Sequence, residues 1–256
     1  MLVAITRAVS RTIADCELTH VARTPIDLPI ARAQHEAYAV ALESLGVRVI
    51  RLNELADLPD AVFVEDAAVV LDEVAVLTRP GAESRRAEVD AMEEALSAFR
   101  PTVRLEAPAT LDGGDVLRLG RTIYVGRTGR TSAEGIASLR SVVEGYGYEV
   151  RAVDVAGALH LKTAVTQLTP EWILVNPAWV DPQHFEGYDA LVIDPGEPFA
   201  ANAVMVNGAV VHSTAFPRTQ AMLRTHGVRV VGVDASELAK AEGGVTCCSL
   251  VFDVAH

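Results

Sequence analysis

One cysteine of this chain stands in a setting that suits a nucleophile. Cys247 follows the glycine pair Gly243-Gly244, and glycines there let a ligand approach the backbone closely. A thiolate is a strong nucleophile at neutral pH when its surroundings lower the pKa of the thiol. The alternative is that Cys247 and the adjacent Cys248 are small buried hydrophobic residues, as cysteines usually are. Because side chains alternate along a strand, we expect only one of the two to face a site.

Histidine and carboxylate residues that could assist this nucleophile occur in other motifs. His160 lies among apolar residues, where a histidine more often fills a core than catalyses a reaction. Glu65 and Asp66 also lie in an apolar stretch, and buried charges are costly unless they are paired or used. Asp112 and Asp115 flank two glycines, a pattern that fits either an ordinary turn or a site.

Together, these residue types predict attack on a positively charged carbon, and a guanidinium provides one. Carboxylates would pair with its nitrogens, the thiolate would attack its central carbon, and the histidine would protonate the departing amine. Zinc catalysis has little support, because the histidines show no metal-ligand spacing such as His-x-x-x-His.

The motifs recur about every 45 residues, a period that indicates a repeated supersecondary unit. They are Phe63–Asp66, Leu111–Asp115, Leu159–Lys162, Ala200–Ala203 and Gly243–Cys247. A ring of such units brings equivalent positions together at its axis. We therefore expect two carboxylates, a histidine, the Asn202 amide and a cysteine to meet at one place.

The elements between the motifs repeat as well. Two strand-like runs follow a motif, and Asn207-Gly208 joins one such pair, a strong hairpin signal because both residues accept positive φ. A helical stretch comes next, with Val89, Met92 and Leu96 on one face of one copy. A further strand-like run completes the unit.

The predicted unit is thus strand, strand, helix, strand, in five copies. The fourth copy has only a short, Pro-flanked helix around 181–186. The last copy is completed across the termini, with Cys248–Phe252 and Leu2–Thr6 as neighbouring strands. The alternative is a doubly wound α/β sheet, but the hairpins argue against it. No glycine-rich phosphate loop follows a strand, so nucleotide binding has no local support.

Composition limits the class of protein. The 256 residues fit one large domain or two small ones, and half of them are hydrophobic. No apolar run reaches the roughly 18 residues of a membrane span, and we find no secretory signal. The net charge of −12 disfavours nucleic acid and mildly favours a cationic ligand. The three cysteines make a poor disulfide set, so we expect a cytoplasmic protein.

Several motifs, in order and over nearly the whole chain, resemble the dimethylarginine dimethylaminohydrolase family. They are Asp60–Asp66, Thr78–Gly81, Ser84–Arg86, Thr110–Asp115, Leu159–Lys162 and Thr246–Ser249. The wider superfamily comprises the guanidine-modifying enzymes, whose five-bladed α/β propeller is called the pentein fold. The resemblance implies a single catalytic domain over residues 1–256, with pseudo-fivefold ββαβ repeats around a central active site.

The resemblance also implies roles for individual residues. Cys247 corresponds to the nucleophile, His160 to the general acid and base, and Asp112 completes the catalytic set. Asp66 and Asp112 match carboxylates that hold the guanidinium, and Glu65 lines the same pocket. Position 112 is often glutamate in the wider superfamily, so the aspartate here is shorter.

The amino acid end of the substrate is expected to have its own partners. By resemblance, Arg85 and Arg130 clamp the α-carboxylate. Asp60, together with the backbone near Leu18, binds the α-amino group. Ala241 is a further substrate-binding position.

One departure separates the chain from a sister class. Arginine deiminases typically carry aspartate two residues after the histidine, and Lys162 stands at that position here. One carboxylate fewer suits a guanidinium whose terminal nitrogen carries methyl groups instead of hydrogens.

We therefore predict a dimethylargininase that forms citrulline and a methylamine through a covalent cysteine thiouronium. It needs no metal or organic cofactor, although a thiolate near a histidine can bind zinc adventitiously. The alternatives are an arginine deiminase or amidinotransferase of the same superfamily, or a non-catalytic pentein scaffold. A scaffold has no reason to keep Cys247 and His160 in register. We expect a small-molecule substrate and no nucleic acid or membrane partner, and the sequence leaves open whether two copies form a homodimer.

Overall fold

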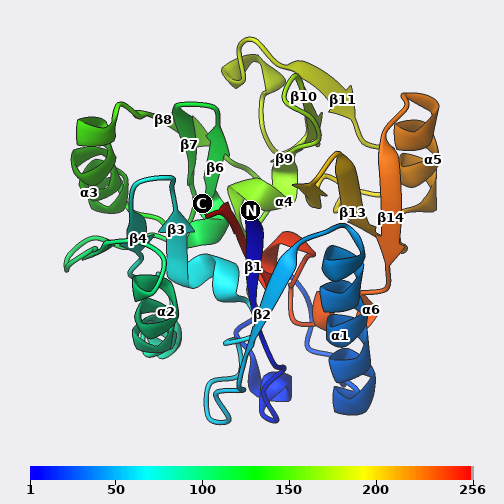
Figure 1. The fold of residues 1–256 in the computed structure, drawn as a ribbon. Coiled ribbons are helices and arrows are strands. Elements are labelled where there is room, and N and C mark those ends of the chain that lie inside the picture. The colour runs from blue at the N-terminus through cyan, green and yellow to red at the C-terminus, as the bar shows by residue number, and fades with distance from the viewer. Residues whose placement is uncertain (255–256) are drawn as a thin grey trace.

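Five small sheets surround a central axis, and the longer helices α1 (Leu28–Ser44), α2 (Glu88–Ser97), α3 (Ala133–Val143) and α5 (Pro217–Thr225) lie on the outside (Figure 1). The computed structural model describes residues 1–254, and its strands form five sheets of three strands each. The predicted five-bladed α/β propeller is therefore confirmed. No helix of the described residues is long and apolar enough to cross a membrane.

The five sheets share one pattern of pairing. The second strand runs antiparallel to the first and parallel to the third. The first strands are β3 (Ala68–Val70), β6 (Val116–Leu119), β9 (Val165–Gln167), β12 (Ala203–Val206) and β15 (Leu250–Asp253). The second strands are β4 (Ala75–Leu77), β7 (Thr122–Arg127), β10 (Trp172–Val175), β13 (Ala209–Ser213) and β1 (Leu2–Arg7). The third strands are β5 (Thr102–Arg104), β8 (Glu149–Asp154), β11 (Asp189–Val192), β14 (Arg229–Val233) and β2 (Arg48–Leu52).

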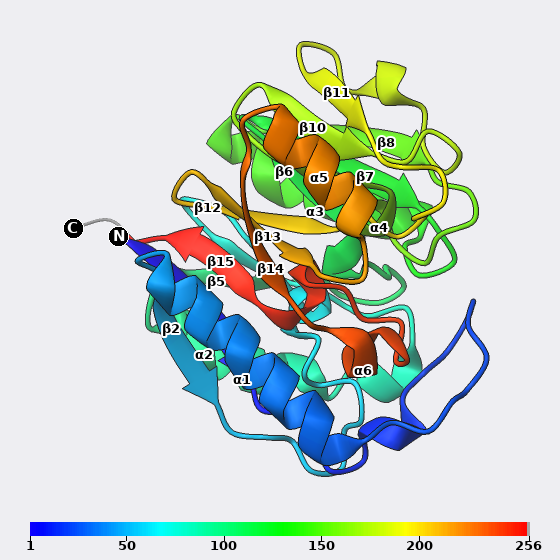
Figure 2. The ribbon, with the colours of Figure 1, turned by 90° about the vertical axis from the view of Figure 1, so that its right-hand side faces the viewer.

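The hairpin and the ring closure follow the sequence signals. Asn207 and Gly208 join β12 to β13 with φ values of 46° and 74°, as a tight primed turn requires. The C-terminal β15 pairs with the N-terminal β1, with Leu2 opposite Asp253. This pairing closes the ring, and the first and last strands of the chain lie side by side (Figures 1 and 2).

A helix connects the second strand to the third in four blades, because parallel strands need a crossover. These helices are α1, α2, α3 and α5. The predicted face of α2 is buried, with Val89, Met92 and Leu96 at most 2% exposed. In the fourth blade the connection holds only the short helix η6 (Pro182–His184), which agrees with the short helix expected there.

Short helical turns, not strands, carry most of the sequence motifs. Directly before a first strand come η2 (Val64–Ala67), η4 (Gly113–Asp115), α4 (Leu161–Ala164) and η7 (Thr246–Cys248). The other short helices are η1 (Ile13–Asp15), η3 (Glu83–Arg85), η5 (Glu144–Tyr146) and α6 (Ser236–Ala239). One expectation is corrected here: the last strand begins at Leu250 and not at Cys248, so strand alternation does not explain how the two cysteines differ.

Two glycines allow these turns to approach one another at the axis. A Cβ atom on Gly113 would lie 2.0 Å from the carbonyl oxygen of Glu65. A Cβ atom on Gly114 would lie 2.6 Å from Nδ1 of His160 and 2.8 Å from Oδ1 of Asp66. Any larger residue would therefore push the neighbouring motifs apart, which is why a Gly-Gly pair stands here.

Candidate active site

Most of the predicted site residues line one narrow cleft. They are Asp60, Asp66, Arg85, Arg130, His160, Ala241 and Cys247. The cleft has a volume of about 20 Å³, enough for roughly one water molecule. The side chains are therefore packed closely against one another.

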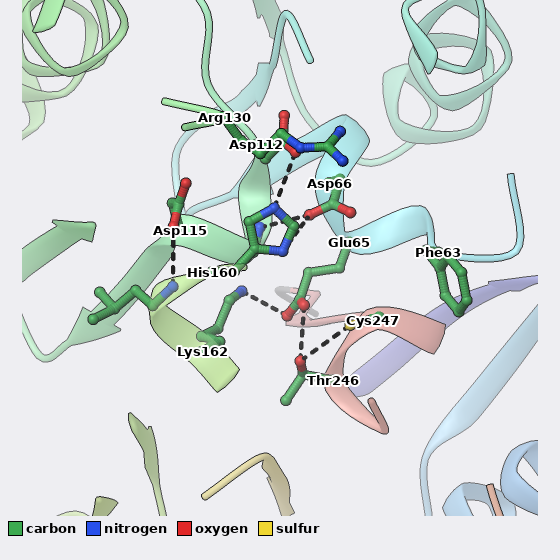
Figure 3. Close-up of polar contacts among 12 residues, drawn as sticks. Phe63, Glu65, Asp66, Asp112, Asp115, Arg130, His160, Lys162, Thr246 and Cys247 are labelled. Atoms are coloured by element: carbon green, nitrogen blue, oxygen red, sulfur yellow. Dashed lines mark hydrogen bonds and ion pairs between the residues drawn. The ribbon is translucent and has the colours of Figure 1, made fainter. Parts of the chain in front are cut away.

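His160 is held between two carboxylates. Its Nε2 lies 3.0 Å from Oδ2 of Asp112, and its Nδ1 lies 3.9 Å from Oδ1 of Asp66 (Figure 3). Asp112 thus reaches the ring despite its short side chain. Burial lowers the pKa of His160, but the Asp66 charge and the hydrogen bond with Asp112 outweigh it and raise the pKa to about 9. The imidazole is therefore protonated at neutral pH and has a proton to donate.

Asp66 remains ionised within the protein interior. Its Oδ1 accepts the N–H of Gly114 at 2.9 Å, and its Oδ2 lies 2.5 Å from the Arg85 guanidinium. Burial opposes ionisation, but the charges of His160 and Arg85 outweigh it and lower the pKa of Asp66 to about 2. A permanent negative charge therefore faces the cleft next to the imidazolium.

Cys247 is the partly exposed member of the cysteine pair. Its Sγ accepts the N–H of Gly244 at 3.3 Å. Removal of the sulfur from water and the carboxylates of Glu65 and Asp66 raise the pKa of Cys247 to about 12. Cys248 is buried, and its Sγ donates to the Gly244 carbonyl at 3.4 Å. Only Cys247 lines the cleft, and its thiol is neutral in the ligand-free protein.

The chain was compared with known proteins. A model of the family "N,N dimethylarginine dimethylhydrolase, eukaryotic" matches residues 23–184. The N(G),N(G)-dimethylarginine dimethylaminohydrolase of Streptomyces coelicolor is 41% identical over 250 residues, which cover 96% of this chain and 95% of the relative. The chain belongs to the dimethylarginine dimethylaminohydrolase family.

Two solved structures extend the family likeness to three dimensions. A Cys-to-Ser variant of the Pseudomonas aeruginosa dimethylarginine dimethylaminohydrolase, complexed with citrulline, shares 36% identity at a TM-score of 0.94, with 98% of both chains covered. A His-to-Gly variant of a dimethylarginine dimethylaminohydrolase, an adduct with S-methyl-L-thiocitrulline, shares 35% identity at a TM-score of 0.92, with 98% of this chain and 99% of the other covered. The predicted pentein fold is confirmed by these likenesses.

The two arginines expected to grip a carboxylate differ in their surroundings. Arg85 is 5% exposed, and its guanidinium contacts Asp66, both carboxylate oxygens of Glu88 and the Phe63 carbonyl. Arg130 is partly exposed, and within residues 1–254 its guanidinium donates a hydrogen bond only to the Thr19 hydroxyl, at 3.1 Å. Arg130 therefore has N–H groups that are free to bind a substrate carboxylate, whereas the N–H groups of Arg85 already donate to Asp66, Glu88 and Phe63.

Glu65 lies deeper than the sequence suggested. Its carboxylate lies 2.6 Å from Nζ of Lys162 and accepts the Thr246 hydroxyl at 2.8 Å (Figure 3). These three residues line a separate axial cavity of about 450 Å³, which shares no lining residue with the cleft. From the sequence, Lys162 is notable only because it replaces the aspartate of arginine deiminases. In the structure it forms an ion pair with Glu65.

The N-terminal loop lines the cleft at Glu17, and it is held there by hydrogen bonds that the sequence did not reveal. Asp60 accepts the N–H of Glu17 at 3.1 Å, and Leu18 follows in the same loop, packed against the core. Glu242, next to Ala241, accepts the backbone N–H groups of residues 19–21. Its φ of 58° is unusual for a glutamate, and no sequence signal marks it.

Three ligand-type residues stand close enough to hold a cation. Asp66, Asp112 and His160 place one oxygen or nitrogen atom each within 4.8 Å of one another, the sole such group among residues 1–254. The hydrogen bond between His160 and Asp112 and the protonation of the ring account for this spacing. We therefore assign no metal to it.

Proposed function

We propose that the chain hydrolyses asymmetric dimethylarginine and monomethylarginine to citrulline and a methylamine. The observation that carries this proposal is the cleft in which the Cys247 thiol, the His160 imidazolium and the Asp66 carboxylate meet. The named activity of relatives with up to 41% identity supports it, as does the citrulline bound by one of them. A single catalytic domain over residues 1–256 carries the reaction.

The charges of the cleft suit a cationic substrate. Asp66 and Asp112 are the carboxylates closest to His160, and they would pair with guanidinium N–H groups. Burial and the carboxylates of Glu65 and Asp66 make a Cys247 thiolate unfavourable in the absence of a cation. A bound guanidinium offsets the charge of these carboxylates, so the Cys247 thiol releases its proton to solvent water when the substrate binds. The Cys247 thiolate is thus formed mainly when a guanidinium substrate is bound.

The chemistry then proceeds in two displacements. The Cys247 thiolate forms a bond to the central guanidinium carbon, and His160 gives its proton to the methylated nitrogen. The carbon–nitrogen bond breaks, the methylamine leaves, and a thiouronium remains on Cys247. The now neutral His160 takes a proton from water, and the resulting hydroxide attacks the same carbon. The carbon–sulfur bond then breaks, and the hydroxyl proton of the adduct returns to the departing Cys247 sulfur, which restores the thiol. Citrulline carries the oxygen of that water.

Location and assembly belong to the proposal as well. The three free cysteines fit the reducing cytoplasm. A homodimer is the assembly to test first, by sedimentation velocity.

Arginine is expected to be a poor substrate and asymmetric dimethylarginine a good one. Lys162 forms an ion pair with Glu65 away from the cleft, so neither residue offers the cleft a free acceptor for an unsubstituted guanidinium. An unpaired N–H group in a closed pocket costs about 1–3 kcal/mol, so kcat/KM for arginine should be roughly 10- to 100-fold lower. A citrulline assay across arginine, monomethylarginine and dimethylarginine measures this. Equal turnover of arginine would assign the chain to the deiminases instead.

Replacing Arg130 with alanine is expected to weaken binding of the amino acid end. Loss of a charge-assisted hydrogen bond should raise KM by the equivalent of about 1.5–3 kcal/mol. Methylguanidine lacks the α-carboxylate, so its turnover should not respond to the change. Arg85→Ala is the contrasting variant: it leaves Asp66 and Glu88 unpaired and buried, so it should lower the melting temperature. Equal losses for both substrates in Arg130→Ala would refute the clamp.

A further inference from the structure

Asp115 is a completely buried carboxylate that does not line the cleft. It is 0% exposed and ends η4, three residues after Asp112. Its Oδ1 accepts the backbone N–H of Leu161 at 3.0 Å, directly after His160 (Figure 3). Its Oδ2 accepts the hydroxyls of Thr128 and Thr131, both at 2.6 Å. Both oxygens are thus engaged by short bonds, which offsets the cost of burying the charge.

Each of the two threonine hydroxyls connects Asp115 to another part of the site. Oγ1 of Thr128 accepts the backbone N–H of Arg130 at 3.1 Å. Oγ1 of Thr131 accepts the backbone N–H of Asp112 at 3.3 Å. A hydroxyl has one hydrogen, and a carboxylate can only accept, so both hydroxyl hydrogens must point to Asp115. Each hydroxyl therefore donates to Asp115 and accepts from a backbone N–H group. We call these the Thr128 relay and the Thr131 relay.

The fold leaves room for this carboxylate at a specific place. Gly126 lies on β7 beside it, and a Cβ atom there would come within 2.8 Å of Asp115 Oδ1 and 3.0 Å of Leu161 Cβ. A strand interior normally favours a side chain, and glycine there often marks a close approach. The glycine thus permits the contact between the two blades that carry Asp115 and His160.

We infer that Asp115 is a positioning residue that sets the mutual placement of His160, Asp112 and Arg130. One carboxylate binds the backbone beside His160 directly and reaches the backbones of Asp112 and Arg130 through one hydroxyl each. The inference rests on the proposed function. In this inference the Thr131 relay positions Asp112, and with it His160, for the catalytic step. The Thr128 relay positions Arg130 to bind the α-carboxylate of the substrate.

Asp115 also acts on His160 through its charge. It is one of three carboxylates, with Asp66 and Asp112, that raise the pKa of His160. Burial raises the pKa of Asp115 itself to about 6, so it is ionised at pH 8. Removing its charge while keeping its shape should therefore lower the pKa of His160, an effect that a purely structural anchor would not produce.

Replacing each threonine with the isosteric valine removes one relay at a time, so the effects of the two relays on KM and kcat can be compared. Thr128→Val should raise KM for dimethylarginine about three- to tenfold with kcat nearly unchanged, because the Arg130 backbone loses its acceptor. Thr131→Val should lower kcat by a similar factor with KM nearly unchanged. Thr219→Val is the matched control: Thr219 is a buried threonine on α5 whose hydroxyl accepts the Asp194 N–H, and its loss should change only stability. Identical effects of the Thr128 and Thr131 variants on both constants would overturn the inference.

A second measurement needs no turnover. NMR titration of the His160 ring, assigned by its absence in His160→Gln, should give a lower pKa in Asp115→Asn than in the unsubstituted protein. An unchanged pKa would overturn the role of the Asp115 charge. If methylarginine is not a substrate but the His160 pKa falls, the proposed function fails while the coupling of Asp115 to His160 stands.

Discussion

Replacing Cys247 with serine is expected to abolish citrulline formation and leave the fold intact. Serine matches the thiol in shape, so the turn η7 keeps its contacts. A hydroxyl is a far weaker acid than a thiol, and its one nearby imidazole is already protonated and cannot serve as a base. A bound guanidinium that suffices to ionise a thiol will not ionise a hydroxyl. Citrulline release measures the loss, and circular dichroism tests the fold.

The neighbouring cysteine supplies the control. Cys248 donates to the Gly244 carbonyl, and a serine hydroxyl can donate the same hydrogen bond, so Cys248→Ser should keep most activity. Enzyme quenched during turnover should carry an added mass on the peptide with Cys247. A mass shift that maps to Cys248 alone would contradict the assignment of the nucleophile.

The fold was predictable because the same physical signals recur in every blade. Each hairpin, helix face and turn is a local pattern, and Asn207-Gly208 needs no distant contact to be recognised. The period of the motifs then implied a ring, and a ring implied that Cys247, His160 and Asp66 converge. The Gly113-Gly114 pair was visible too, but its reason was not, since it depends on the close approach of Glu65 and His160.

The features that the sequence did not reveal are contacts between blades. Lys162 and Glu65 are far apart in the chain, and nothing local to either predicts their ion pair. Nothing local to Arg85, expected by resemblance to clamp the substrate carboxylate, predicts its burial between Asp66 and Glu88. Such pairings are decided by which turns meet at the axis and by side-chain orientation. They therefore require coordinates.

The electrostatics of the cleft give its two reactive groups opposite resting states. Asp66 helps to keep His160 protonated and, together with burial and Glu65, helps to keep Cys247 neutral, because an anion favours a nearby cation and disfavours a nearby thiolate. In the enzyme without substrate, His160 is thus protonated and can donate a proton, whereas Cys247 is a neutral thiol and a weak nucleophile. Binding of a cationic substrate ionises the Cys247 thiol and leaves His160 protonated. The proton on His160 is accordingly the one whose loss should stop the reaction.

His160→Ala is expected to lower kcat by about 10²- to 10⁴-fold and to change KM much less, because protonation of the leaving amine occurs in the transition state. His160→Gln is the sharper control, since an amide can still bond to Asp112 but has no proton to transfer. For the unsubstituted enzyme, kcat/KM should fall as pH rises through about 9, where free His160 loses its proton. This alkaline decline should be absent from the residual activity of both variants. Near-normal turnover in either variant, or an unchanged alkaline decline, would return His160 to the role of a buried structural histidine.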